Sequence, residues 1–313
     1  MGIELSVVIP AYNEEDSVGP CYREIVEALS PLGITYEVIF VDDGSSDSTF
    51  SNLQQLAADS NDLKVIKLRK NFGQSAALRA GFDHTEGEIM VTMDADLQND
   101  PKDIPSMLKM LKEEDCDVVC GWRYNRKDAS SKKVFSKLAN FLRRNLTGEY
   151  IHDSGCTLRA YSKECAMDLE LSGELHRYIP AMLSWKGYKL GEMKVNHRQR
   201  KFGNTKYNWK RLIKGYLDLL LITFWQRYSL RPMHIFGGFG LLLGFLGTLI
   251  TVYLVMMRLL YRQSLSDRPL FTLGVFLILI AVQFLALGIV TDIVSKIYFG
   301  QNGRKNYSVK VIE

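Results

Sequence analysis

The segment Glu88–Asp96, with the sequence EIMVTMDAD, joins a short apolar run directly to two carboxylates. Four to eight apolar residues bounded by polar turn residues are typical of a buried β-strand. Runs of the same kind occur at Leu5–Ile9, Glu37–Val41, Leu63–Leu68 and Asp117–Cys120. The first part of the chain is therefore predicted to contain a sheet of five short, buried strands.

Helical patterns separate these runs, at Asp16–Leu29, Ser48–Ala58, Ser75–Asp83 and Asp103–Glu114. Alternation of strand and helix, with strands that are apolar almost throughout, is typical of a parallel sheet covered on both faces by helices. The predicted fold class is therefore α/β, with a Rossmann-like, mostly parallel sheet. In such sheets, ligands bind at the carboxyl ends of the strands.

Polar, turn-forming residues follow each of the five runs. The clusters have the sequences PAYNE (10–14), DDGS (42–45), KNFGQ (70–74), DAD (94–96) and GWR (121–123). Because the carboxyl ends of parallel strands lie at one edge of the sheet, we expect these clusters to form a single site.

Asp94 and Asp96 are the strongest candidates for metal ligands. Side chains two residues apart on an extended chain point the same way, so both carboxylates can meet one cation. Hard oxygen ligands suit Mg²⁺ or Mn²⁺, and Mg²⁺ usually binds through one or two carboxylates together with substrate phosphates. The alternative is that one of the two aspartates simply caps a helix.

Asp42 and Asp43 end another strand and precede a glycine turn. An aspartate at this position can accept a hydrogen bond from a base or a ribose, or it can close the turn through its own backbone. No GxGxxG opens the first helix and no GxxxxGK[ST] occurs, which disfavours a dinucleotide site and a P-loop.

The amino-acid composition limits the classes of protein to which the chain can belong. The 313 residues are 47% hydrophobic and 24% charged, which is typical of a globular chain. A net charge of +4 without blocks of like charge gives no indication of a nucleic-acid partner. The five cysteines have no CxxC spacing, so neither a zinc site nor a disulfide framework is predicted, and a reducing compartment fits best.

Two stretches near the C-terminus, Ile235–Met257 and Pro269–Thr291, contain 23 residues each and no Asp, Glu, Lys or Arg. A helix of this length spans roughly 34 Å, and the hydrocarbon core of a bilayer is about 30 Å thick. Two transmembrane helices are predicted, the alternative being a pair of buried core helices. Gly240 and Gly244 form a small-residue face that could pair the two spans or join protomers into a homo-oligomer.

The predicted organisation is a catalytic domain over residues 1–208, a juxtamembrane segment over 209–232, a two-helix membrane domain over 233–295 and a tail over 296–313. The juxtamembrane segment is basic and amphipathic, which is typical of a helix in the membrane interface, although an ordinary surface helix is the alternative. Lys and Arg are more frequent outside the two spans than in the loop between them. This bias favours a cytoplasmic catalytic domain and two cytoplasmic termini.

Taken together, the motifs resemble those of family 2 glycosyltransferases. The resemblance is carried by VVIPAYNEE (7–15), VDDGSSD (41–47), NFGQSAALRAG (71–81), MDADLQNDP (93–101) and GWR (121–123). It implies an inverting enzyme with the GT-A fold that uses a nucleotide sugar.

Two later motifs and the two spans make the chain similar to the polyprenyl-phosphate glycosyltransferase branch of that family. These motifs are HDSGCTLRAY (152–161) and RKFGNTKY (200–207). The branch includes dolichyl-phosphate mannose synthases and bacterial undecaprenyl-phosphate sugar transferases. The usual Gly-Glu-Ser-Lys of the branch is Gly203-Asn-Thr-Lys206 in this chain, which keeps the lysine and changes the two residues before it.

The resemblance implies roles for individual residues. Asp153 corresponds to the catalytic carboxylate, and Asp94 and Asp96 act beside it and hold Mg²⁺ or Mn²⁺. The nucleotide sugar is expected to contact Pro10, Ala11, Tyr12, Glu14, Asp43, Asp94 and Gln98. The acceptor phosphate is expected to contact Arg123, Lys137, Arg200 and Lys206.

The expected reaction is transfer of a hexose from a UDP-sugar to undecaprenyl phosphate at the cytoplasmic face of the membrane, with UDP-glucose as the preferred donor. UDP-N-acetylglucosamine, a UDP-aminopentose and GDP-mannose are alternative donors. A processive polysaccharide synthase is disfavoured, because its Q-x-x-R-W motif is missing and only two spans follow the domain. A non-catalytic membrane subunit that keeps the nucleotide-sugar fold is the alternative from another class.

Overall fold

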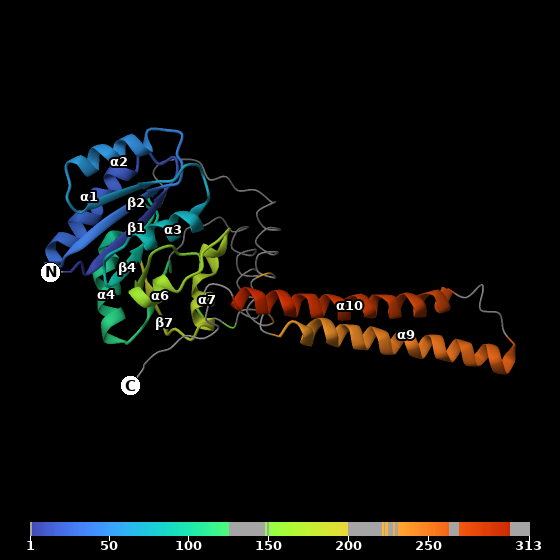
Figure 1. Cartoon of the computed structure of the whole chain (residues 1–313). Coiled ribbons are helices and arrows are strands. Elements are labelled where there is room, and N and C mark those ends of the chain that lie inside the picture. The colour runs from blue at the N-terminus through green and yellow to red at the C-terminus, as the bar shows by residue number, and fades with distance from the viewer. Residues whose placement is uncertain are drawn as a thin grey trace. The chain divides into compact units, whose positions relative to one another are not determined.

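The structure is a computed structural model that describes residues 2–124, 148, 150–199, 221, 223–224, 228, 231–262 and 269–300. The chain divides into two compact units, Met1–Asp218 and Leu219–Glu313. In Figure 1 the first unit contains the sheet and its helices, and the second contains the two long helices α9 and α10.

The first unit is built on a seven-stranded sheet with the strand order β3-β2-β1-β4-β6-β5-β7. Its strands are β1 (Leu5–Ala11), β2 (Tyr36–Asp42), β3 (Leu63–Lys67), β4 (Ile89–Thr92), β5 (Val118–Trp122), β6 (Arg159–Ser162) and β7 (Leu190–Lys194). All neighbouring strands pair in parallel except β6, which runs antiparallel to both β4 and β5. The predicted mostly parallel sheet is confirmed.

The five predicted runs correspond to β1–β5, with small differences at their ends. The sequence analysis predicted neither β6 nor β7. Arg159 and Ser162 bound a run of only four residues in β6, and Gly191 and Glu192 interrupt the apolar pattern of β7. Both strands owe their place to tertiary pairing, which outweighs their weak local pattern.

Helices cover both faces of the sheet. One face packs against α1 (Val18–Leu29), α2 (Thr49–Ala58) and α4 (Ile104–Glu113). The opposite face packs against α3 (Gln74–Asp83), α6 (Lys163–Met167) and α7 (Ile179–Trp185). Short 3-10 turns occur at Ser30–Leu32, Pro101–Asp103 and Leu175–Tyr178.

Successive side chains of an inner strand, β1, reach opposite faces of the sheet. In β1, Val7 and Ile9 join the cluster under α1 and α4, whereas Val8 joins the cluster under α3. This alternation with two buried faces explains why the strand is apolar at nearly every position.

The turn after β2 requires a glycine. Gly44 has a φ of +69°, and a Cβ on it would lie 2.4 Å from the carbonyl carbon of Lys70. The loop after β2 and the loop after β3 therefore touch through their backbones at the carboxyl edge of the sheet, which contributes to the site below.

The second unit contains α9 (Met233–Tyr261) and α10 (Pro269–Gly300). The described stretches of 29 and 30 residues, Met233–Tyr261 and Pro269–Tyr298, have mean hydropathies of 2.2 and 2.8, and each has only 17% of its most apolar window buried. Both are long and apolar enough to cross a bilayer, and their exposure argues against a pair of soluble core helices.

The glycine face of α9 packs against α10 within the same chain. A Cβ on Gly240 would lie 3.1 Å from the carbonyl oxygen of Ala281, and a Cβ on Gly247 would lie 2.7 Å from that of Gly274. Of the two uses that the sequence left open for this face, pairing of the two spans is the one the structure shows, in an antiparallel arrangement.

Candidate active site

The segment after β4 presents every second side chain to the carboxyl edge of the sheet. Ala95, Leu97 and Asn99 are buried, whereas Asp94, Asp96 and Gln98 are partly exposed. The expected common direction of Asp94 and Asp96 is consistent with this alternation. The backbone amide of Gln98 donates to Oδ1 of Asp96 at 3.1 Å, which fixes the turn between Asp96 and Gln98.

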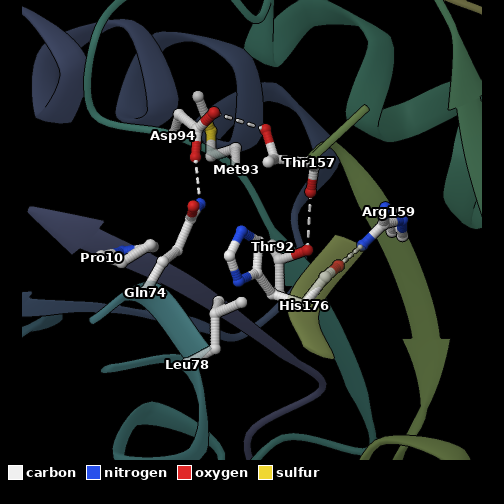
Figure 2. A pocket seen from close by; sticks show the side chains of 9 residues that line it. All are labelled: Pro10, Gln74, Leu78, Thr92, Met93, Asp94, Thr157, Arg159 and His176. Atoms are coloured by element: carbon white, nitrogen blue, oxygen red, sulfur yellow. Dashed lines mark hydrogen bonds between the residues drawn. The ribbon is translucent and has the colours of Figure 1, made fainter. Parts of the chain in front are cut away.

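Asp94 is held by two side chains from different parts of the sheet edge. Gln74 Nε2, at the start of α3, donates to one carboxylate oxygen, and the hydroxyl of Thr157 donates to the other, both at 2.8 Å. Figure 2 shows these bonds above a pocket that is also lined by Pro10, Leu78, Thr92, Met93, Arg159 and His176.

Asp94 is partly exposed, and its surroundings shift its pKa. Burial raises the pKa of Asp94, against the hydrogen bonds from Thr157 and Gln74 and the positive charges of Arg123 and Arg159. Each of these four groups favours the ionised carboxylate. A cation close to Asp94 would act in the same direction.

A divalent cation fits this set of donors. Two carboxylates and the amide oxygen of Gln98 are hard oxygen ligands, as Mg²⁺ and Mn²⁺ prefer. Among the described residues, no group of three or more His, Cys, Asp or Glu side chains could hold a metal by itself. A site of two carboxylates that is completed by substrate phosphates agrees with both facts.

The two aspartates at the end of β2, Asp42 and Asp43, accept hydrogen bonds from different loops. Asp42 is fully buried and accepts a hydrogen bond from the amide of Ser45 at 3.1 Å, which is the turn closure considered as an alternative. Asp43 accepts the amides of Phe72 and Gly73 at 2.7 and 2.9 Å, so it joins the loops after β2 and β3.

The residues at the end of β1 and directly after it also differ in burial and in hydrogen bonds. Ala11 is buried, and its carbonyl accepts the amide of Asp43 at 2.9 Å, whereas Tyr12 is 48% exposed. Pro10 lines the pocket beside Asp94. The carboxylate of Glu14 accepts a hydrogen bond from the Ser17 hydroxyl at 2.7 Å, next to the first residue of α1.

Arg123 and Asp153 form the second centre of the site. Nε and Nη2 of Arg123 donate to the two carboxylate oxygens of Asp153 at 2.6 and 2.9 Å, and both side chains are largely buried. Burial lowers the pKa of Arg123, but the hydrogen-bonded charge of Asp153 outweighs it and the pKa lies above its ordinary value. Asp153 is correspondingly stabilised as an anion.

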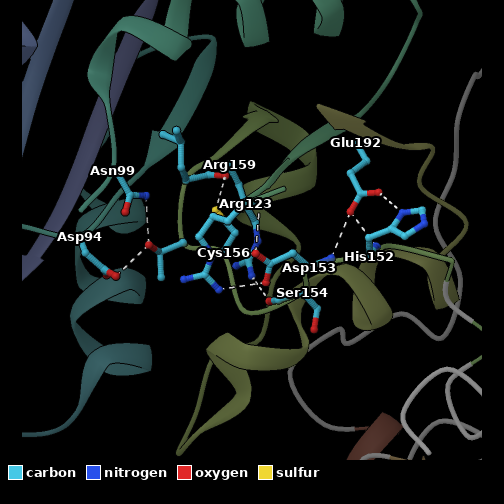
Figure 3. Close-up of polar contacts among 11 residues, drawn as sticks. Asp94, Asn99, Arg123, His152, Asp153, Ser154, Cys156, Arg159 and Glu192 are labelled. Atoms are coloured by element: carbon cyan, nitrogen blue, oxygen red, sulfur yellow. Dashed lines mark hydrogen bonds and ion pairs between the residues drawn. The ribbon is translucent and has the colours of Figure 1, made fainter. Parts of the chain in front are cut away.

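The loop that carries Asp153 is tied to the sheet at several points, which Figure 3 shows. Thr157 binds Asp94, and its carbonyl accepts the hydroxyl of Thr92 at 2.7 Å. The buried Arg159 donates to the carbonyl of Ser154. The loop Asp153–Thr157 therefore joins the Asp94 side of the site to the Arg123 side.

The segment before Arg200 runs along the segment after β4 that carries Asp94, Asp96 and Gln98. Asn99 and His197 form an isolated antiparallel bridge, and the amide of Arg198 donates to the carbonyl of Gln98 at 2.9 Å. The guanidinium of Arg198 pairs with Glu24 and Asp100 at 2.5 and 2.7 Å.

Three predicted acceptor residues, Lys137, Arg200 and Lys206, lie outside the described residues. Conversely, the structure adds side chains that the sequence analysis did not single out: Gln74, Thr157, Arg159 and Glu192. Gln74, Thr157 and Arg159 lie within the motifs NFGQSAALRAG and HDSGCTLRAY, but a motif does not show which carboxylate or carbonyl a side chain in it binds. Glu192 lies in none of the quoted motifs.

Comparison with known proteins identifies the family of the chain. The model of the family described as "Glycosyl transferase family 2" matches residues 6–169. The chain therefore belongs to glycosyltransferase family 2, and the resemblance noted in the sequence is confirmed.

The similar full-length relatives are polyprenyl-phosphate sugar transferases. Dodecaprenyl-phosphate galacturonate synthase of Rhizobium johnstonii is 40% identical over 314 residues, which cover 99% of this chain and 93% of the relative. Undecaprenyl-phosphate 4-deoxy-4-formamido-L-arabinose transferase of Klebsiella pneumoniae is 35% identical over 309 residues, covering 98% and 93%.

Solved structures with the same fold include glucosyl-3-phosphoglycerate synthase of Mycobacterium tuberculosis. Its complex with Mg²⁺ and UDP has a TM-score of 0.54 at 19% identity and covers 72% of this chain and 79% of that one. Its complex with Mn²⁺, UDP-glucose and phosphoglyceric acid has a TM-score of 0.53 at 18% identity, with 72% and 80% covered. At this identity the likeness shows the fold alone, which is the expected GT-A fold.

Proposed function

We propose that the chain transfers one sugar, with inversion, from a nucleoside-diphosphate sugar to polyprenyl phosphate. The observation that carries the proposal is the loop Asp153–Thr157. Thr157 holds Asp94 of the segment after β4, and Asp153 holds Arg123 through a two-point ion pair. Such an arrangement suits two anionic substrates, because the carboxylates can hold a metal ion at the donor diphosphate and the guanidinium can bind the acceptor phosphate.

The donor nucleotide is proposed to bind at the carboxyl ends of β1, β2 and β4. Pro10, Ala11, Tyr12 and Asp43 are assigned to the base and ribose. Glu14 is assigned to support of this loop, because its carboxylate already accepts the Ser17 hydroxyl. Asp43 keeps the loops after β2 and β3 together through two backbone amides, so its loss would open this part of the site.

Asp94 and Asp96 are assigned to Mg²⁺ or Mn²⁺, with Gln98 beside them facing the donor. A bound divalent cation would neutralise charge on the leaving diphosphate as a Lewis acid. Gln74 and Thr157 keep the Asp94 carboxylate in one orientation before substrate arrives, which is the contribution of this chain to that step.

Arg123 is assigned to the acceptor phosphate together with Lys137, Arg200 and Lys206. The fork to Asp153 uses two of the five guanidinium N–H groups of Arg123, so further donors of the same group can bind phosphate oxygens. The positive charge of the Arg123 guanidinium favours the anionic form of Asp153. A phosphomonoester has a second pKa of about 6, so the acceptor is already an anionic nucleophile near neutral pH and Asp153 has mainly to orient it.

The donor sugar is proposed from similarity. The sequence analysis favoured UDP-glucose, whereas the relatives named above are a galacturonate synthase and a formamido-arabinose transferase. The 40% identity over nearly the whole chain favours galacturonate ahead of glucose as the transferred sugar. UDP is the proposed nucleotide, as in the structural neighbours with this fold.

The two apolar helices indicate a membrane protein, and we propose that α9 and α10 span the bilayer with the catalytic unit and both termini in the cytoplasm. A polyprenyl chain stays in the bilayer, because exposing each CH₂ to water costs about 0.8 kcal/mol. The phosphate of such a lipid lies at the membrane surface, where a catalytic unit joined to two spans can reach it.

The test is a donor panel. Membranes containing the full chain are incubated with undecaprenyl or dodecaprenyl phosphate and with radiolabelled UDP-galacturonate, UDP-glucose, UDP-N-acetylglucosamine, UDP-4-formamido-arabinose or GDP-mannose. Labelled lipid should form with one donor, and it should disappear in Asp96→Ala while the exposed control Asp59→Asn keeps it. Absence of product with every donor, or full activity of Asp96→Ala, would favour the non-catalytic subunit instead.

A further inference from the structure

Glu192 is a largely buried carboxylate beside the loop that carries Asp153. It lies in the edge strand β7, opposite Cys120 of β5 in a parallel pairing. Its side chain is 12% exposed and points to the start of the loop that carries Asp153, as Figure 3 shows. The sequence analysis gave this residue no role.

Three donors from the loop meet this one carboxylate. Oε1 accepts the backbone amides of His152 and Asp153 at 2.6 and 3.1 Å. Oε2 lies 2.6 Å from Nδ1 of His152, which must carry the proton because an ionised carboxylate only accepts. Hydrogen bonds to a charged group are roughly twice as strong as neutral ones, so Glu192 fixes the backbone at Asp153 itself.

His152 completes a closed ring of contacts around Asp153. Its imidazole stacks on Trp122, with ring centroids 4.4 Å apart and an interplanar angle of 16°. Trp122 directly precedes Arg123, whose guanidinium holds the Asp153 side chain. The side chain of Asp153 is thus held by Arg123, directly after β5, and its backbone amide is held by Glu192 of β7. These are two separate sets of hydrogen bonds.

We propose that Glu192 is a positioning residue for the transfer reaction, which holds Asp153 and, through it, Arg123 in the orientation that the acceptor phosphate requires. This inference rests on the proposed function. Glu192 acts through Asp153 and touches no substrate. A misplacement of about 1 Å at a reacting group can cost about 100-fold in rate, so a residue that fixes this backbone has a large effect on turnover.

The experiment compares Glu192→Ala, Glu192→Gln, Asp153→Asn and the double variant Glu192→Ala/Asp153→Asn in the full-length protein. Glu192→Ala leaves two amides without their acceptor, whereas Glu192→Gln keeps an acceptor oxygen at nearly the same place. Glu88→Ala is the matched control, because Glu88 is an exposed carboxylate that directly precedes β4, the middle strand of the same sheet.

Glu192→Ala should lower kcat by about 100-fold, with unchanged UDP binding, and Glu192→Gln should recover most of the loss. In the Asp153→Asn background, Glu192→Ala should cost little more, because both changes disable the same unit. Hydrogen exchange of the peptide spanning residues 150–158 should accelerate in Glu192→Ala and stay normal in Glu88→Ala.

Two results would overturn the inference: wild-type kcat in Glu192→Ala, or the same loss from Glu192→Ala with and without Asp153→Asn. A general structural defect is recognised by weakened UDP binding in Glu192→Ala that Glu192→Gln does not repair, and it too counts against a positioning role. If the wild-type protein transfers no sugar, the proposed function fails, while the exchange comparison still decides whether Glu192 holds the loop.

Discussion

Arg123 and Asp153 form a two-point ion pair, in which Nε and Nη2 of the guanidinium lie 2.6 and 2.9 Å from the two carboxylate oxygens. The pair joins the end of β5 to a loop that follows some thirty residues later in the chain. It sets the electrostatics of the proposed acceptor side, because a single charged fork fixes both groups at once.

Arg123→Lys should therefore be far from conservative. Lysine keeps the charge but cannot donate in two parallel directions, so Asp153 loses one of its two bonds and its fixed plane. We expect kcat/KM for transfer to polyprenyl phosphate to fall about 100-fold, measured from initial rates. Arg177→Lys, at an exposed surface pair with Glu174, is the control and should keep full activity. Equal rates for the two variants would show that the fork has no role.

Thr157→Val should weaken the donor side without touching the acceptor side. The variant keeps the shape of the side chain and removes the hydroxyl that donates to Asp94 at 2.8 Å. A hydrogen bond to a charged group contributes about 1.5–3 kcal/mol, so donor turnover should fall by roughly 10- to 100-fold. Thr157→Ser keeps the hydroxyl and should retain most of the activity. If serine and valine gave the same loss, the methyl group would be responsible instead.

Glu37 should stabilise the fold in a pH-dependent way. It is 2% exposed, forms an ion pair with Lys64 at 2.8 Å, and accepts hydrogen bonds from the Ser6 hydroxyl and from the backbone amide of Glu86 at 2.5 and 2.7 Å. Burial raises the pKa of Glu37, but these bonds outweigh burial, and the pKa lies below its ordinary value of 4.5.

A lowered pKa means that the stabilisation is complete above pH 4.5 and is lost as the pH falls through the folded-state pKa. Glu37→Gln should lower the free energy of unfolding by about 1–3 kcal/mol at pH 7, and by less at pH 4. Thermal unfolding of the purified protein at both values measures the difference, with Glu88→Gln as the exposed control. A Tm deficit that stays constant with pH would contradict this assignment.

Gly247→Leu should separate the two spans. A Cβ on Gly247 would already lie 2.7 Å from the carbonyl oxygen of Gly274, so a larger side chain cannot fit without moving α10. Gly238→Leu is a matched control on the same helix, because nothing lies within 4 Å of a Cβ at that position. The Tm in detergent should drop for Gly247→Leu only, and similar values for both variants would place the helix contact elsewhere.

The parts of the fold that follow from local pattern could be predicted from the sequence. The five strands β1–β5 and the helices between them are marked by apolar runs and turn residues, and the spans by the absence of charge. β6 is different, because Arg159–Ser162 is short and polar at both ends and its place between β4 and β5 depends on residues far away in the chain.

The site residues also fall into two groups, those that local sequence pattern could predict and those that depend on distant contacts. Asp94 and Asp96 stand directly after a predicted strand, so their place at the sheet edge follows from topology. Thr157 and Glu192 contribute through contacts across 63 and 39–40 residues of sequence. Such contacts depend on the three-dimensional packing of β6 and β7. Thr157 lies within the motif HDSGCTLRAY, but the motif does not show which side chain it binds, and Glu192 lies in none of the quoted motifs.

The insertion of β6 between β4 and β5 has a consequence for synthesis of the chain. β4 ends at Thr92, and the strand that pairs with its outer side begins only at Arg159. At about 5–20 residues per second, the ribosome takes roughly 3–13 s to make the intervening segment. During that interval the nascent sheet ends in an unpaired, apolar β4, the kind of edge that recruits other chains. Translation that stalls between these two strands should therefore yield aggregates, whereas release after Ser162 allows the edge to close.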